Sequence, residues 1–158
     1  MPGIKSHIQF LPGVLNWIRN KLRDLQSSPP DIYMRVTNPT RRTVLASCVL
    51  VADHGASRRK GLLGRKGLAP GEGLWIVPCE SVHTIGMEFS IDLIYLDRNH
   101  KVRKVVRDVP RWRLSACFSA HSVIELAAGS VYPTQTCRGD QLEFLSVPAP
   151  SKTEFDSD

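Results

Sequence analysis

The chain has 158 residues, of which 42% are hydrophobic and 23% are charged, and its formal net charge is +6. This length suits one domain with a single sizeable core, and the composition excludes disordered, collagen-like and disulfide-scaffold proteins. The positive charge favours anionic partners through long-range attraction, but it does not identify a function.

An amphipathic helix is predicted in the first segment, residues 1–30. Residues 14–26 carry apolar side chains at helical spacing, and Pro29-Pro30 marks a linker after them. Such a helix packs on the domain or on a partner, or it lies on an anionic membrane surface as a peripheral contact. No secretory or membrane-spanning pattern is evident, so we expect a cytoplasmic protein whose four cysteines are free thiols or ligands rather than disulfides.

Seven strands are predicted in the second segment, residues 31–147, because runs of branched and apolar residues alternate there with turn residues. These runs are 43–52, 74–77, 81–85, 91–96, 102–109, 121–126 and 141–147. Asp97 to His100 is a hairpin signal, and the basic side chains interleaved in the strand that follows suit an exposed edge.

A short helix is predicted over residues 58–63, with Ser57 as its N-cap and Gly64 as its end. Short strands separated by turns favour a mainly β fold, as a compact β-sandwich or small barrel with this one helix inserted. The third segment, residues 148–158, is polar and is expected to be a disordered tail.

The motifs in the second segment, residues 31–147, resemble those of a known family. The chain reads H-T-x-G-M-x-F-x-I-D-x-x-x-L-D from His83, then W-R-x-S-A-C, V-I-E-L-x-A-G and G-D-x-L, preceded by R-x-x-G-L-L-G-R from Arg58 and G-E-G-L-W from Gly71. This order resembles domain of unknown function 192, DUF192. The resemblance implies a compact, mainly β domain and brings no agreed reaction, cofactor or substrate. Leu63 stands where the family has methionine, and Ser90 where proline is common.

Two equal spacings offer a metal site. Cys79-x-x-x-His83 and Cys117-x-x-x-His121 together supply two sulfurs and two nitrogens, the ligand set of tetrahedral zinc. Against zinc, neither half has the tight cysteine knuckle of known sites, and both cysteines also suit buried apolar positions. Cysteine nucleophile chemistry assisted by His83 is a further alternative. No other cofactor is indicated.

A ligand pocket is the interpretation that the sequence favours. His83, Met87, Asp92 and Glu125 all match family positions, and an imidazole, a thioether and carboxylates can line a site for a small polar ligand or cation. The structural alternative is that Asp92 caps a turn or pairs with Arg113, while Met87 fills the core.

Basic residues gather around the short helix, where Arg58 fits the family pattern and can bind an anion. The cluster from Arg58 to Lys66 lacks aromatic residues, so a nucleic-acid role is not favoured. The sequence therefore predicts a non-catalytic module that binds a small ligand or a protein through His83, Met87, Asp92, Glu125, Arg58 and Arg113. The alternatives are a metal- or thiol-assisted hydrolase using Cys79, His83 and Cys117, and a basic adaptor that docks on anionic membrane or nucleic acid.

Overall fold

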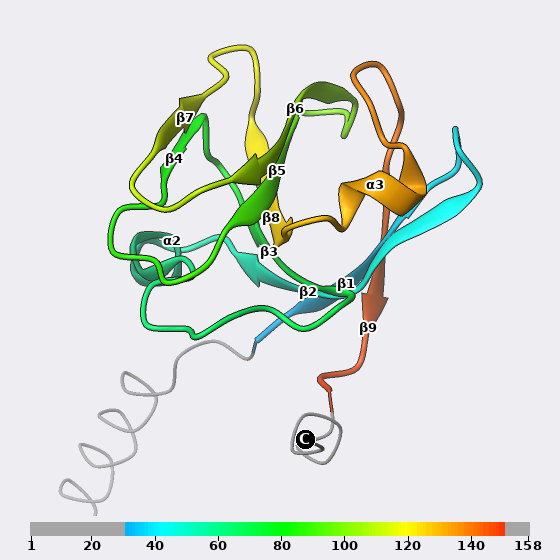
Figure 1. Cartoon of the computed structure of the whole chain (residues 1–158). Coiled ribbons are helices and arrows are strands. Elements are labelled where there is room, and N and C mark those ends of the chain that lie inside the picture. Colours follow the sequence, from blue (N-terminus) through cyan, green and yellow to red (C-terminus); the bar gives the residue numbers. More distant parts are fainter. Residues whose placement is uncertain (1–30, 151–158) are drawn as a thin grey trace, which may run out of the picture. The chain divides into compact units, whose positions relative to one another are not determined.

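A seven-stranded sheet forms the body of the protein in the computed structural model, which describes residues 31–150 (Figure 1). The elements are β1 (Tyr33–Asn38), β2 (Thr43–Ala52), α2 (Gly55–Lys60), β3 (Glu72–Ile76), β4 (Ser81–His83), β5 (Ile91–Leu96), β6 (Val102–Val109), β7 (Leu114–Ala116), β8 (Ser122–Ala127), α3 (Val131–Thr134) and β9 (Glu143–Val147). The predicted mainly β fold is confirmed. The predicted N-terminal helix and residues 151–158 of the predicted tail lie outside the described residues.

The large sheet is mixed and open. Its strand order is β6-β5-β8-β3-β2-β1-β9, with β2 and β3 parallel and the other neighbours antiparallel. The two edges of the sheet approach each other. The Val102 N–H in β6 donates to the Asp140 carbonyl at 2.9 Å, and the Gly139 N–H, just before β9, donates to the Val102 carbonyl at 2.9 Å. The sheet therefore curls without closing into a barrel, and α3 lies between its two ends (Figure 1).

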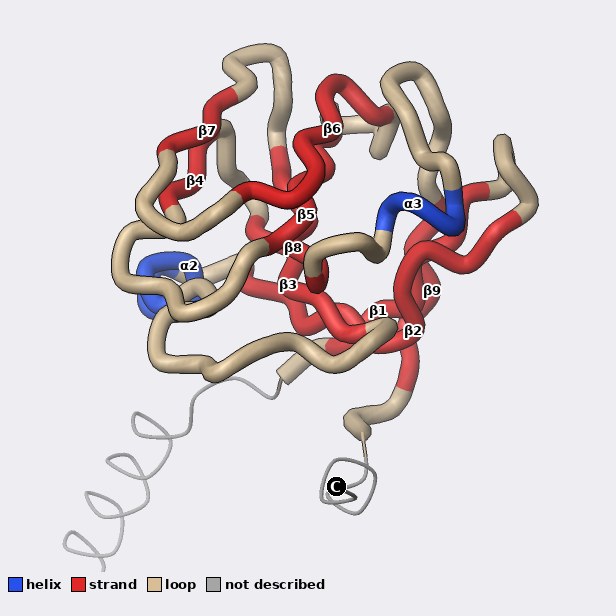
Figure 2. The backbone as a smooth tube through the Cα atoms, viewed as in Figure 1, coloured by secondary structure: helices blue, strands red, loops and turns tan. Residues whose placement is uncertain are grey.

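The neighbouring strands β5 and β8 are largely apolar on both faces, as expected where both faces of a sheet are covered. Every residue of β5 is buried, and alternate side chains enter two different apolar clusters. Ile94 and Leu96 face the cluster inside the curl together with Val131 of α3. Leu93 and Tyr95 face the outer cluster, over which α2 and the two-stranded ribbon of β4 and β7 are arranged (Figure 2).

Several predicted elements have the expected bounds. Residues 43–52 and 91–96 form β2 and β5, the hairpin at Asp97–His100 joins β5 to β6, and β6 is an edge strand. The prediction of one inserted helix was incomplete, since α3 is a second one within residues 31–150. No helix in this part of the chain is long and apolar enough to cross a membrane.

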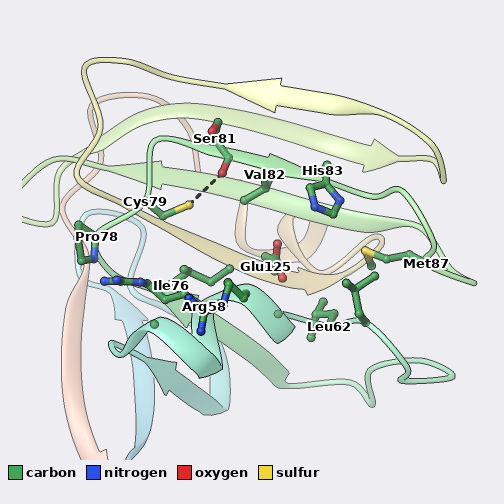
Figure 3. Close-up of a pocket in the computed structure, with 14 residues that line it drawn as sticks. Arg58, Leu62, Ile76, Pro78, Cys79, Ser81, Val82, His83, Met87 and Glu125 are labelled. Atoms are coloured by element: carbon green, nitrogen blue, oxygen red, sulfur yellow. Dashed lines mark hydrogen bonds between the residues drawn. The ribbon is translucent and has the colours of Figure 1, made fainter.

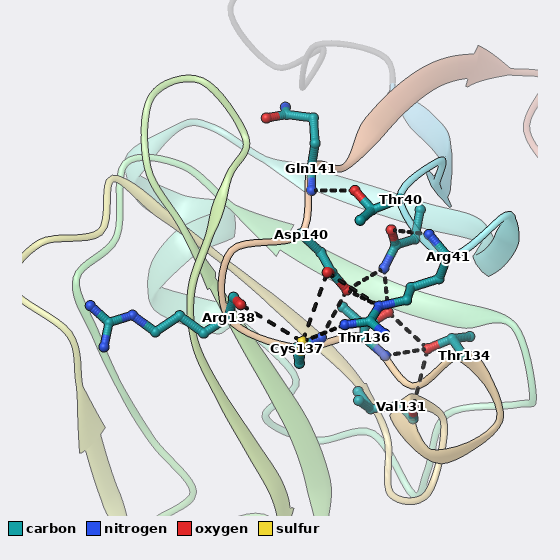
Figure 4. Close-up of polar contacts among 10 residues, drawn as sticks. Thr40, Arg41, Val131, Thr134, Thr136, Cys137, Arg138, Asp140 and Gln141 are labelled. Atoms are coloured by element: carbon teal, nitrogen blue, oxygen red, sulfur yellow. Dashed lines mark hydrogen bonds and ion pairs between the residues drawn. The ribbon is translucent and has the colours of Figure 1, made fainter.

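A polar network ties the β1–β2 turn to the segment before β9 (Figure 4). The buried Asn38 amide donates to Thr136 Oγ1 at 2.9 Å and to Asp140 Oδ2 at 3.0 Å, and Arg41 Nε donates to the same Asp140 oxygen at 3.0 Å. Burial alone would raise the pKa of Asp140, but the hydrogen bonds from Arg41 and Asn38 outweigh it and hold that pKa below its usual value. This network fixes one open end of the curled sheet.

Asp92 performs a comparable task inside the curl. Its fully buried carboxylate accepts hydrogen bonds of 2.9 Å from the backbone N–H groups of Asp108 in β6 and Val131 at the start of α3. It thereby ties β5 to the next strand, β6, and to the more distant α3, and its role is that of a cap.

We expect Asp92→Ala to lower the free energy of unfolding by about 2–5 kcal/mol, because two buried N–H groups lose their acceptor. Asp92→Asn should cost less, since its remaining carbonyl oxygen still accepts one bond. Urea unfolding monitored by circular dichroism measures both variants. The exposed Glu88→Ala is the control, and a loss for Asp92→Ala no larger than the control's would contradict the capping role.

Candidate functional site

A cavity of about 280 Å³ opens on the outer face of the sheet, between α2 and the β4–β7 ribbon (Figure 3). Apolar side chains form most of its walls, and a few charged or polar groups lie among them. The lining residues are Gly55, Arg58, Arg59, Gly61, Leu62, Leu63, Ile76, Pro78, Cys79, Ser81, Val82, His83, Met87 and Glu125. The cavity thus gathers residues from α2, β3, β4 and β8 and from the connections between them.

Glu125 of β8 reaches this cavity because of the strand register. It lies opposite Leu74 of β3 on one side and Leu93 of β5 on the other, so all three side chains share the outer face. Its side chain is almost completely buried, with 4% of the residue exposed, and Oε2 has no hydrogen-bond partner among the described residues. Burial raises the pKa of this carboxyl to about 7.

The helix α2 places Arg58 at the rim. It begins at Gly55, three residues before the predicted start, and its N-cap is His54 rather than Ser57, whose hydroxyl donates to the His54 carbonyl at 2.8 Å. It ends at Gly61, not Gly64, because Gly61 takes a positive φ of 49°. Arg58 Nη1 donates to the carbonyls of Asp53 at 3.3 Å and Val77 at 3.4 Å, which holds the helix against the end of β3.

Cys79 and His83 both line the cavity, but their predicted partners do not. The Cys79 thiol donates to the Ser81 carbonyl at 3.1 Å, and burial raises its pKa. The Cys117 thiol instead lies 3.5 Å from the Ser119 hydroxyl. Within residues 31–150 no three His, Cys, Asp or Glu side chains are arranged to hold a metal ion. The two predicted segments are neighbours, since the Cys79 N–H donates to the His121 carbonyl at 2.8 Å and the Cys117 N–H donates to the Glu80 carbonyl at 2.8 Å. The side chains of Cys79, His83, Cys117 and His121 nevertheless do not form the predicted zinc set.

Asp92 and Arg113 do not belong to this cavity either. Asp92 lies opposite Leu126 and faces the inside of the curl, whereas its neighbour Leu93 shares the outer face with Glu125. Arg113 is exposed beside β7, where its guanidinium donates to the Trp112 carbonyl at 3.3 Å. The predicted grouping of Asp92 with Glu125 is thus wrong, since strand alternation puts the two carboxyls on opposite faces.

Four of the residues predicted to bind a ligand do meet in one place. The structure brings Arg58, His83, Met87 and Glu125 around the cavity from three separate stretches of chain. Met87 follows a turn at Gly86, where φ is 81°, so it reaches the cavity from a loop and not from a continuous strand after His83. Their binding role stays a prediction.

Sequence reasoning missed Tyr95, whose buried side chain lies on the same face of the sheet as Leu93 and Glu125. Tyr95 is two residues from Leu93 on the same face, and its pKa is raised to about 12 mainly by burial, with further contributions from Cys79, Cys117 and Glu125. The nearby Ser115 hydroxyl lowers the pKa of Tyr95 and so offsets part of this rise. A tyrosine in a largely apolar strand was the available signal, because its hydroxyl needs a partner when buried.

Comparison with known proteins agrees with this architecture. A family model for DUF192, described as uncharacterized ACR, matches residues 36–144. The chain belongs to the DUF192 family. The matched range contains every residue that lines the cavity. No curated protein matches the chain.

Two solved structures share the fold of this DUF192 domain. One is a protein from Sinorhizobium meliloti 1021, provisionally described as a transcription regulator, with 18% identity and a TM-score of 0.62 over 75% of this chain and 97% of that one. The other is a protein of unknown function from Novosphingobium aromaticivorans DSM 12444, with 17% identity and a TM-score of 0.58 over 75% of this chain and 94% of that one. At these identities the likeness establishes the fold and not the function.

The raised pKa of Glu125 makes folding stability depend on pH. The folded-state pKa of about 7 lies above the ordinary value of 4.5. At low pH the carboxyl is protonated in both the folded and the unfolded state, so no charge is buried. As the pH rises through that interval, ionisation increasingly opposes folding. Between about pH 5 and pH 8 the free energy of unfolding should therefore fall by about 2–3 kcal/mol. Glu125→Gln removes the charge, so we expect it to abolish this part of the pH dependence.

Urea unfolding of the wild type and Glu125→Gln at both pH values measures the difference. Glu80→Gln, at an exposed neighbouring position, should behave like the wild type. Identical pH profiles for wild type and Glu125→Gln would show that this carboxyl titrates normally.

Proposed function

We propose that this domain is a non-catalytic module that binds a small ligand in the cavity between α2 and the β4–β7 ribbon. The observation that carries the proposal is the buried Glu125 carboxyl, which lines this cavity and has one oxygen without a partner among residues 31–150. Buried polar groups are nearly always paired, so an unpaired one facing a cavity indicates that another molecule supplies its partner.

The size of the cavity favours a small molecule over a protein partner. Its volume of about 280 Å³ lies just below the range of about 300–1,000 Å³ that is typical of ligand sites. The apolar walls include Leu62, Ile76 and Val82, which suit the body of a small organic molecule. The few polar groups between them would fix its orientation.

The geometry supports binding more than thiol catalysis. A nucleophilic cysteine needs a lowered pKa, whereas burial raises the pKa of Cys79 and favours the unreactive thiol. Cys117, the other thiol of the hydrolase hypothesis, does not line the cavity. The basic adaptor hypothesis depends partly on residues 14–26, which are outside the described part of the chain.

A substitution that fills the cavity should prevent binding. Leu63 is partly buried in the cavity wall, and Leu63→Trp adds bulk there without changing any charge. Leu145→Trp, at an exposed position of β9, is the matched control. Heteronuclear NMR of the wild type identifies which small amines, alcohols, acids and hydrocarbons shift the resonances of residues in the cavity. We expect the same compounds to leave the resonances of Leu63→Trp unchanged.

The control variant should retain the wild-type response to each compound. If none of these compounds perturbs the cavity of the wild type, or if Leu63→Trp binds as the wild type does, the cavity is not a binding site.

A further inference from the structure

The surroundings of Glu125 indicate the chemistry of the missing partner. On the outer face of the sheet its cross-strand neighbours are Leu74 and Leu93, and Val123 lies two residues earlier on the same strand. None of these side chains can donate a hydrogen bond or neutralise a charge. Glu125 is thus a carboxyl in an apolar setting that is open on the side of the cavity (Figure 3).

The two arginines that line the cavity do not compensate for the cost of burying the Glu125 charge. Arg58 uses its guanidinium to hold the carbonyls of Asp53 and Val77, and Arg59 is exposed. Burial raises the pKa of Glu125, and no cation among the described residues lowers it again. Residues 31–150 thus bury this acid without supplying the counter-charge that such a group requires.

Three kinds of ligand head group would interact with this carboxyl differently. An ammonium group supplies both a positive charge and N–H donors, so its hydrogen bond is charge-assisted and strong. A hydroxyl group offers a neutral hydrogen bond only. A carboxylate would add a like charge at short range and be repelled.

We propose that the ligand of this cavity is a small organic ammonium compound, with its cationic head on the Glu125 carboxyl and its apolar body against Leu62, Ile76 and Met87. This inference rests on the proposed function and names the class of ligand. The three apolar side chains line the same cavity as the carboxyl. The pairing gives the buried acid its missing donor and counter-charge at once.

Other titratable and charged groups face Glu125 from the elements packed around it. They are Arg58 and Arg59 from α2, Cys79, His83 at the end of β4, and Tyr95 from β5. A pH profile of binding alone would mix the titration of Glu125 with that of His83. The carboxyl must therefore be observed directly, through the ¹³C resonance of a labelled glutamate side chain.

The test compares three probes of equal chain length: pentylamine, pentanol and pentanoate. Isothermal titration at about pH 8, where the amine stays protonated, should show pentylamine binding about tenfold or more tightly than pentanol, and pentanoate more weakly than pentanol. Saturating pentylamine should lower the pKa read from the Glu125 carboxyl resonance by about one unit or more. Leu63→Trp should block pentylamine.

The variant Glu125→Gln should lower pentylamine affinity to the level of pentanol, while Glu80→Gln should leave it unchanged. Glu125→Leu provides a second variant that also removes the charge. Wild-type protein that binds pentanol as tightly as pentylamine would overturn the ammonium assignment and leave the binding cavity intact. If none of the three probes perturbs the cavity, both the ligand class and the proposed function are wrong.

Discussion

The pairing of β5 with β8 is the constraint on which the rest of this structure depends. These neighbouring strands are buried on both faces, so their register decides which side chains enter the curl and which face outwards. In the observed register Leu93 lies opposite Glu125 and Asp92 opposite Leu126. A slip of β8 by one residue against β5 would turn Glu125 into the curl, on the same face as Asp92, and would turn Ile124 and Leu126 outwards.

The two carboxyls on these strands show how different environments give similar groups different tasks. Asp92 accepts two backbone N–H groups and holds β6 and α3 to the centre of the sheet. Glu125 faces a cavity, and one of its oxygens has no partner in the described part of the chain. Both carboxyls are buried, so exposure alone does not distinguish a structural carboxyl from a candidate binding group. The number of carboxyl oxygens that accept a hydrogen bond does distinguish them.

The sequence predicted local features well and distant contacts poorly. The bounds of β2 and β5, the hairpin after Asp97 and the basic edge strand follow from composition and turn chemistry, which act over a few residues. The strands β1 and β7 and the helix α3 were missed. β7 and α3 have only three and four residues, which is too short for a periodic signal. The face of Asp92 depends on which residue of β8 lies opposite it, and that register is set by packing across the whole sheet.

The floor of the cavity lies on the large sheet, and its walls come from shorter elements and loops. Glu125 stands on a central strand whose apolar neighbours fix its position, whereas α2, the turn at Gly86 and the short ribbon supply most of the walls. Leu63, which replaces the methionine expected for the DUF192 family, lies in one of these walls, and a Cβ placed on Gly86 would stand 3.5 Å from its side chain. Methionine is unbranched and flexible, while leucine is branched and stiffer, so this exchange reshapes the space beside the carboxyl without touching the sheet. Under the proposed function, wall residues of this kind would set which molecule fits, and the buried acid would set which chemical group that molecule presents.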